Sequence, residues 1–240
     1  MRFTWIGGAT FLLELGAFRL LFDPVFADRF ALGAETVTRR APLPPVDVAG
    51  ADAVCLTCLR ADHCEAEALA RSGATMVVAP RASAIPEGAG ELRELGWEES
   101  VSLERPGERL TVTAVAARPE SGDDNGYFLR HEAGGRAFTA HVTGDARFSE
   151  GLRAIQRAHG HANLLVLYLG AEGAPAARTS LDGADAMQFV YRMQPNAIAA
   201  VHHHTFSHYT EPLDAFLEPL GRTIYDRRLR ILREGESFEK

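Results

Sequence analysis

The chain has 240 residues, 46% of them hydrophobic, and a formal net charge of −7. This length fits one large α/β domain, so we expect residues 1–240 to form a single domain. The acidic balance argues against nucleic-acid binding, because nucleic-acid binders usually carry a basic face. No segment approaches the roughly 18 apolar residues of a membrane span. Three cysteines within residues 55–64 do not form a secreted disulfide framework, which predicts a cytoplasmic protein.

The first half of the chain is rich in predicted strands. β-Branched and aromatic residues bounded by glycines predict three opening strands, followed by a proline-containing loop over residues 27–50 and a short buried strand. The four strands are Phe3–Ile6, Thr10–Leu15, Phe18–Phe22 and Ala53–Thr57. A helix, a strand and two strand pairs follow, at Glu65–Ser72, Thr75–Ala79, Glu98–Leu103 with Arg109–Ala116, and Tyr127–His131 with Ala137–Thr143.

In the second half, predicted helices and strands alternate. The helices are Ser149–His159, Asp182–Met193 and Leu213–Leu220, and the strands are Leu164–Leu169, Ala197–Val201 and Arg230–Leu232. Paired strands followed by alternating strands and helices indicate two sheets packed face to face with helices outside. The predicted fold is therefore α/β, a four-layer αββα sandwich.

Polar residues follow three of the predicted strands. Asp62 and His63 come after the strand at residues 53–57, Asp145 comes after residues 137–143, and His202 comes directly after residues 197–201. Functional side chains in α/β proteins gather at the carboxyl ends of strands. Two carboxylates and two imidazoles would suit a divalent metal ion, although an Asp-His pair can also simply cap a loop.

Five segments in order resemble motifs of the metallo-β-lactamase fold superfamily. They are Trp5–Glu14, Leu20–Val25, Leu56–His63, Thr143–Asp145 and Val201–Phe206. The branch they resemble in particular contains the hydrolases similar to ascorbate-6-phosphate lactonase and to N-acyl-phosphatidylethanolamine phospholipase D. The similarity in order and spacing extends from residue 3 to about residue 220, and it implies the sandwich fold described above.

The resemblance also implies roles for individual residues. The family's second metal site carries over to Asp62, His63 and His202, with Asp145 in the bridging position. Asp23 matches an aspartate that supports the site from behind by orienting a ligand histidine. One divalent ion, zinc, manganese or iron, is the expected cofactor.

The first metal site of the family departs from its pattern here. Cys58 and Arg60 stand where the family has its first two histidines, and Arg118 stands near the next ligand histidine. Arginine stays protonated and has no lone pair to donate to a metal. We therefore expect one ion rather than two.

The leading interpretation is a metal-dependent hydrolase of an ester, a lactone or a phosphodiester. Asp62 or Asp145 would take a proton from water, while Arg60, Arg118 and His204 would contact an anionic substrate. His204 enters because alternate residues of an extended segment share a side, which would place it with His202.

Two other interpretations use the same residues. In one, the guanidinium groups of Arg60 and Arg118 replace the metal, and a non-catalytic protein binds an anionic ligand or a partner. In the other, Cys58 acts through its thiol, although a buried cysteine beside the site can also simply pack. The sequence specifies neither the substrate nor the oligomeric state.

Overall fold

The computed structural model describes residues 1–86, 89–118, 124–149, 151–173 and 178–240. Within these ranges one sheet has seven strands in the order β16-β1-β2-β3-β6-β7-β8. β2 pairs antiparallel with β1 and β3, whereas β6 pairs parallel with β3. The strands are β1 (Arg2–Gly7), β2 (Thr10–Leu15), β3 (Phe18–Phe22), β6 (Ala53–Cys55), β7 (Met76–Pro80), β8 (Glu91–Leu95) and β16 (Ser237–Glu239).

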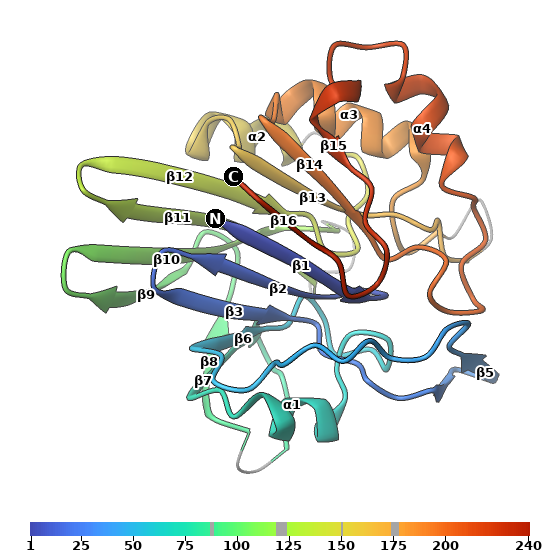
Figure 1. The fold of residues 1–240 in the computed structure, drawn as a ribbon, viewed down its shortest axis with the longest axis horizontal. Helices are drawn as coiled ribbons and strands as arrows, with labels where there is room; N and C mark the ends of the chain where they lie inside the picture. Colours follow the sequence, from blue (N-terminus) through green and yellow to red (C-terminus); the bar gives the residue numbers. More distant parts are fainter. Residues whose placement is uncertain (87–88, 119–123, 150, 174–177) are drawn as a thin grey trace.

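The second sheet, over the same described residues, has seven strands in the order β15-β14-β13-β12-β11-β10-β9. Its strands are β9 (Ser100–Arg105), β10 (Glu108–Ala116), β11 (Asn125–Ala133), β12 (Arg136–Val142), β13 (Leu164–Tyr168), β14 (Ala197–Val201) and β15 (Leu229–Arg230). The two sheets are stacked, and helices lie outside them (Figure 1). These two mixed sheets with surrounding helices confirm the predicted α/β sandwich.

The helices are divided between the two outer faces. α1 (Ala66–Ser72) lies beside the first sheet, whereas the other three lie beside the second: α2 (Gly151–His159), α3 (Gly183–Met193) and α4 (Asp214–Leu220) (Figure 1). A single 3₁₀ turn among the described residues, Asp226–Arg228, precedes β15. Asp182 is the N-cap of α3, and its side chain accepts a hydrogen bond from the Asp185 backbone N–H. None of the helices in the described ranges is long and apolar enough to cross a membrane.

An aromatic core fills the space between the sheets. The rings of Phe11 and Phe22 stack with centroids 4.5 Å apart, and the Phe22 ring meets Tyr127 of the second sheet edge to face at 6.3 Å. Ring pairs of this geometry stabilise a core beyond the area that they bury. This packing fixes the two sheets against each other, and thereby fixes the loops at their shared edge.

Several short strands were not predicted from the sequence. The expected loop at residues 27–50 contains the hairpin of β4 (Arg29–Leu32) and β5 (Glu35–Thr38), and β8 and β16 were also missed. These strands are exposed on much of their surface and carry charged side chains, so their apolar alternation is weak. The predicted strand at residues 53–57 ends earlier, at Cys55.

The strand directions bring distant segments together. β12, β13 and β14 run parallel to one another, so their carboxyl ends lie at one edge of the second sheet. β3 and β6 run parallel in the first sheet, and Asp23 and Asp62 follow them. This arrangement places the candidate site between the two sheets.

Candidate metal centre

The predicted ligands are all buried, and they meet at this shared edge. His63 and His202 are 0% exposed, and Asp62 and Asp145 are at most 1% exposed. Nε2 of His63 lies 3.3 Å from Asp145 Oδ2, and Nε2 of His202 lies 3.3 Å from Asp62 Oδ2. The structure thus brings together all four side chains that the strand ends and the resemblance singled out.

The carboxylate of Asp23 holds the His63 ring in position through Nδ1. Its Oδ2 lies 3.0 Å from His63 Nδ1 and accepts hydrogen bonds from the hydroxyls of Thr57, at 2.7 Å, and Tyr168, at 2.8 Å. The Thr57 backbone N–H donates to Oδ1 at 2.7 Å. Burial, followed by the charge of Asp23, raises the pKa of Tyr168, so its hydroxyl keeps the proton that it donates. A carboxylate can only accept, so His63 Nδ1 carries a proton and Nε2 faces the site.

His202 is oriented in a similar way by a backbone carbonyl. Its Nδ1 lies 3.0 Å from the Leu169 carbonyl oxygen, which accepts the Nδ1 proton. Burial lowers the pKa of His202 and favours a neutral ring, whose Nε2 then bears a lone pair. That lone pair faces Asp62 Oδ2, so two acceptors confront each other, an arrangement that a cation between them would stabilise.

The pKa values of Asp62 and His63 shift in opposite directions because the two side chains interact. Burial raises the pKa of Asp62, but the charge of His63 and the neighbouring side chains of His202, His208 and Arg60 lower it further, leaving it well below its ordinary value. Burial lowers the pKa of His63, whereas Cys58 and the carboxylate of Asp62 raise it above its ordinary value. Without a cation His63 therefore takes up a proton, which a bound ion would displace.

Arg60 inserts its guanidinium into this cluster. One nitrogen forms an ion pair with Asp145 Oδ2, lies 3.2 Å from His63 Nε2 and lies 3.5 Å from Glu172 Oε2. Nε lies 3.6 Å from Asp62 Oδ1. Arg60 is thus a fixed positive charge among three carboxylates.

Glu172 and His208 complete the cluster and were not among the predicted site residues. Both belong with Asp62 and His202 to a set of ligand atoms that lie within 4.8 Å of one another. Glu172 follows β13 at the edge that also holds Asp145 and His202, so its position after a buried strand was an available signal. His208 stands on an irregular loop, where no periodicity marks it.

Several buried polar atoms of the cluster have no hydrogen-bond partner. They include Asp62 Oδ1, Asp145 Oδ1 and both ring nitrogens of His208, whereas Asp145 Oδ2 forms the ion pair with Arg60. Buried polar atoms are normally paired, and leaving one unpaired costs about 1–3 kcal/mol. Asp62, Asp145 and Glu172 carry three negative charges against one on Arg60, a balance that one divalent ion would neutralise.

The remaining predicted residues do not belong to the grouped ligand atoms. Arg118 donates from Nε to Asp124 Oδ2 at 2.8 Å, so it neutralises a carboxylate that the sequence analysis did not single out. Cys58 is buried, 2% exposed, and lines a cavity together with Arg60, Arg81 and Asp124.

His204 departs from its expected position because the backbone is not extended there. His202 and His204 have φ values of 58° and 41°, in the left-handed region, so the alternation of sides does not apply. The His204 ring contacts Trp5 and His203, with centroids 5.2 and 4.5 Å away. Its predicted contact with substrate finds no support in this geometry.

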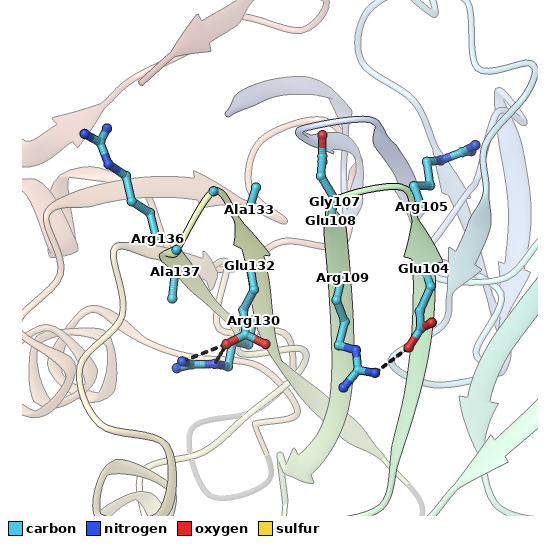
Figure 2. Close-up of a pocket in the computed structure, with 12 residues that line it drawn as sticks. Glu104, Arg105, Gly107, Glu108, Arg109, Arg130, Glu132, Ala133, Arg136 and Ala137 are labelled. Atoms are coloured by element: carbon cyan, nitrogen blue, oxygen red, sulfur yellow. Dashed lines mark hydrogen bonds and ion pairs between the residues drawn. The ribbon is translucent and has the colours of Figure 1, made fainter.

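A second hollow lies at the opposite end of the second sheet. Figure 2 shows it between the turns of the β9–β10 and β11–β12 hairpins, where Arg109 pairs with Glu104 and Arg130 with Glu132. Asp145 and Arg118 follow the other ends of these strands. The hollow therefore has no part in the buried cluster.

Comparison with known proteins gives related sequences and folds. Residues 18–203 match the model of a family described as the beta-lactamase superfamily domain. The uncharacterized proteins Rv0906 of Mycobacterium tuberculosis and Mb0930 of Mycobacterium bovis are each 27% identical over 187 residues, which cover 70% of this chain and 48% of theirs. The chain thus spans about half the length of these curated relatives.

Three solved structures share the fold at low sequence identity. Isothiocyanate hydrolase from Delia radicum gut bacteria has a TM-score of 0.77 and 18% identity, covering 100% of this chain and 99% of that one. Igni18, a metallo hydrolase from Ignicoccus hospitalis, has a TM-score of 0.68 and 16% identity, with 100% and 98% covered. The diiron β-hydroxylase CmlA from Streptomyces venezuelae has a TM-score of 0.72 and 12% identity, with 100% and 54% covered.

Proposed function

Because the chain belongs to the beta-lactamase superfamily domain family, we propose that it is a hydrolase that works with one divalent metal ion. The observation that carries the proposal is the buried cluster of carboxylates and imidazoles, in which the lone pair of His202 Nε2 faces Asp62 Oδ2 at 3.3 Å. Such a donor set fits a cation.

The residue types suit zinc, manganese or iron, since imidazole and carboxylate bind all three. The family pattern assigns the ion to Asp62, His63, Asp145 and His202. A bound divalent ion polarises the bond to be broken and lowers the pKa of water. Asp62 or Asp145 would take up the proton of the attacking water, and the hydrogen bond from His63 to Asp23 would keep the His63 ring in position.

We propose a small anionic ester, lactone or phosphodiester as the substrate. The cavity beside the cluster supports this choice, because it is lined by the arginines Arg60 and Arg81 and by the hydroxyl-bearing Ser83. These bond types are taken from the lactonase-like and phospholipase D-like hydrolases that the sequence resembles. Isothiocyanates, which also contain an electrophilic carbon, are a further substrate class to test, because an isothiocyanate hydrolase has the same fold.

One observation favours a second candidate function. The Arg60 guanidinium forms an ion pair with Asp145 and also approaches Asp62, so it supplies a positive charge where the family places a metal. A family member that binds an anionic ligand without metal would use this arrangement. The two functions differ in metal content.

The test is elemental analysis of protein purified without chelator or affinity metal, for wild type and His202→Ala. About one equivalent of a transition metal, lost in the variant, supports the hydrolase and justifies assays with phosphorylated lactones, phosphodiesters and isothiocyanates. Absence of metal in both proteins contradicts it and supports the metal-free candidate.

A further inference from the structure

We propose that the ion is held by Asp62, Glu172, His202 and His208, and that Arg60 excludes it from the set that the family pattern assigns. The inference rests on the proposed function, because it assumes that one divalent ion is bound. It differs in the ligands: Glu172 and His208 take the places that the family gives to His63 and Asp145.

The first step is the position of Arg60. Its guanidinium forms an ion pair with Asp145 Oδ2, and the same nitrogen lies 3.2 Å from His63 Nε2. These are the two atoms that Asp145 and His63 would turn toward a metal, 3.3 Å apart. A second cation at this position would be repelled by the guanidinium, which cannot lose its charge.

The second step is the unexplained burial of His208. Its side chain is only 3% exposed, and neither ring nitrogen has a hydrogen-bond partner. Its Nε2 lies 3.5 Å from Asp62 Oδ2, the oxygen that also faces His202 Nε2 at 3.3 Å. An imidazole buried with two unpaired nitrogens is costly unless one of them binds a ligand. A metal ion bound to one of these nitrogens would accept its lone pair.

The third step is the way that the surroundings hold the two new residues. The His208 ring packs against Phe206 and Tyr209, with centroids 6.1 and 4.3 Å away, and against Phe30 of the β4–β5 hairpin at 6.2 Å. The Thr179 hydroxyl donates to Glu172 Oε2 at 2.9 Å. Supporting contacts of this kind orient metal ligands and tune their affinity.

The chemistry of the set agrees with a single divalent ion. Two imidazoles and two carboxylates contribute two negative charges, which one divalent ion neutralises. Arg60 meanwhile balances Asp145. The guanidinium lies farther from the proposed ligands, 3.5 Å from Glu172 Oε2 and 3.6 Å from Asp62 Oδ1, than from Asp145, with which it forms its closest ion pair.

The experiment measures zinc binding to chelator-treated protein by isothermal titration calorimetry. Glu172→Gln and His208→Gln are compared with Asp145→Asn, and His159→Gln and Glu99→Gln, both outside the cluster, serve as matched controls. We expect wild type and controls to bind one ion, and Glu172→Gln and His208→Gln to weaken binding by about 10- to 100-fold each. Asp145→Asn should weaken binding less than either of these variants, because it removes the ion-pair partner of Arg60 and not a ligand.

The cobalt-loaded proteins give a second readout. Loss of the His208 imidazole should change the visible absorption of bound cobalt, whereas Asp145→Asn should leave it as in wild type. Circular dichroism shows whether each variant is folded, and His208→Asn replaces a variant that is not.

The outcomes separate the two proposals. Wild type that binds one ion, with Glu172→Gln and His208→Gln unaffected or with an equal loss in Asp145→Asn, overturns the inference and leaves the single-ion hydrolase standing. Wild type that binds no ion overturns the proposed function and the inference with it.

Discussion

Replacement of Asp23 by asparagine should destabilise the protein strongly while preserving its shape. Oδ2 of Asp23 receives the Thr57 hydroxyl, the Tyr168 hydroxyl and His63 Nδ1 at 2.7, 2.8 and 3.0 Å. An amide nitrogen in that position would face donors with a donor. Asparagine tolerates the φ of 40° found at this position, so backbone strain does not contribute.

The magnitude follows from the number of hydrogen bonds lost. Breaking a buried charged network costs about 3–5 kcal/mol, out of a total stability of about 5–15 kcal/mol. For a chain of this size the melting temperature should fall by about 6–20 °C. Thermal unfolding followed by circular dichroism measures this, with the exposed Asp28→Asn as a control. A loss below about 1 kcal/mol would refute the argument that Asp23 is the acceptor joining Thr57, Tyr168 and His63.

Three further predictions concern Arg60, His141 and the bound ion. Arg60→His should raise the metal content per chain above that of wild type, because a lone pair replaces the guanidinium that pairs with Asp145; unchanged content by elemental analysis would argue against exclusion by Arg60. Burial, and next the charge of His159, lowers the pKa of His141 from 6.5 to about 3, so the unfolded chain takes up the proton first as the pH falls. Stability should therefore be lost from about pH 6.5 downward, and His141→Phe should reduce the loss between about pH 6.5 and 4.5 by about 2–3 kcal/mol in urea titrations. A variant that loses stability in parallel with wild type would contradict this. A chelator should lower the melting temperature of wild type but not of His202→Ala, because an ion present at 1,000 times its Kd stabilises the fold by about 4 kcal/mol; equal effects on both proteins would speak against His202 as a ligand.

The layers of the fold were predictable because their signals are strong and local. The buried strand β13 is a run of leucines and a valine that ends in Tyr168, and α3 begins at an aspartate that caps it. The hairpin at residues 29–38 was missed because its strands are short and exposed, and its apolar residues contact Phe206, far away in the sequence. Long-range packing of this kind leaves no periodic pattern in the hairpin itself.

The same distinction between local signals and long-range packing applies to the residues of the candidate site. Asp62, His63, Asp145 and His202 directly follow or closely follow buried strands, where the sequence indicates function. The charge of Arg60 is evident from the sequence. Its ion pair with Asp145 could not be predicted, because it depends on how the two sheets dock. Glu172 follows the buried strand β13 and could have been singled out for that reason, whereas His208 lies on an irregular loop and its role depends on its position in space.

The position of the cluster between the sheets has a consequence for the order of folding. Asp62 follows a strand of the first sheet, whereas Asp145, Glu172 and His202 follow strands of the second. The chain between Asp62 and His202 forms a loop of 140 residues that closes only when the sheets have docked. An ion bound there would crosslink the two sheets and close this long loop, which has a large closure entropy. It can bind only after the two sheets have docked, so it should slow unfolding more than it speeds folding.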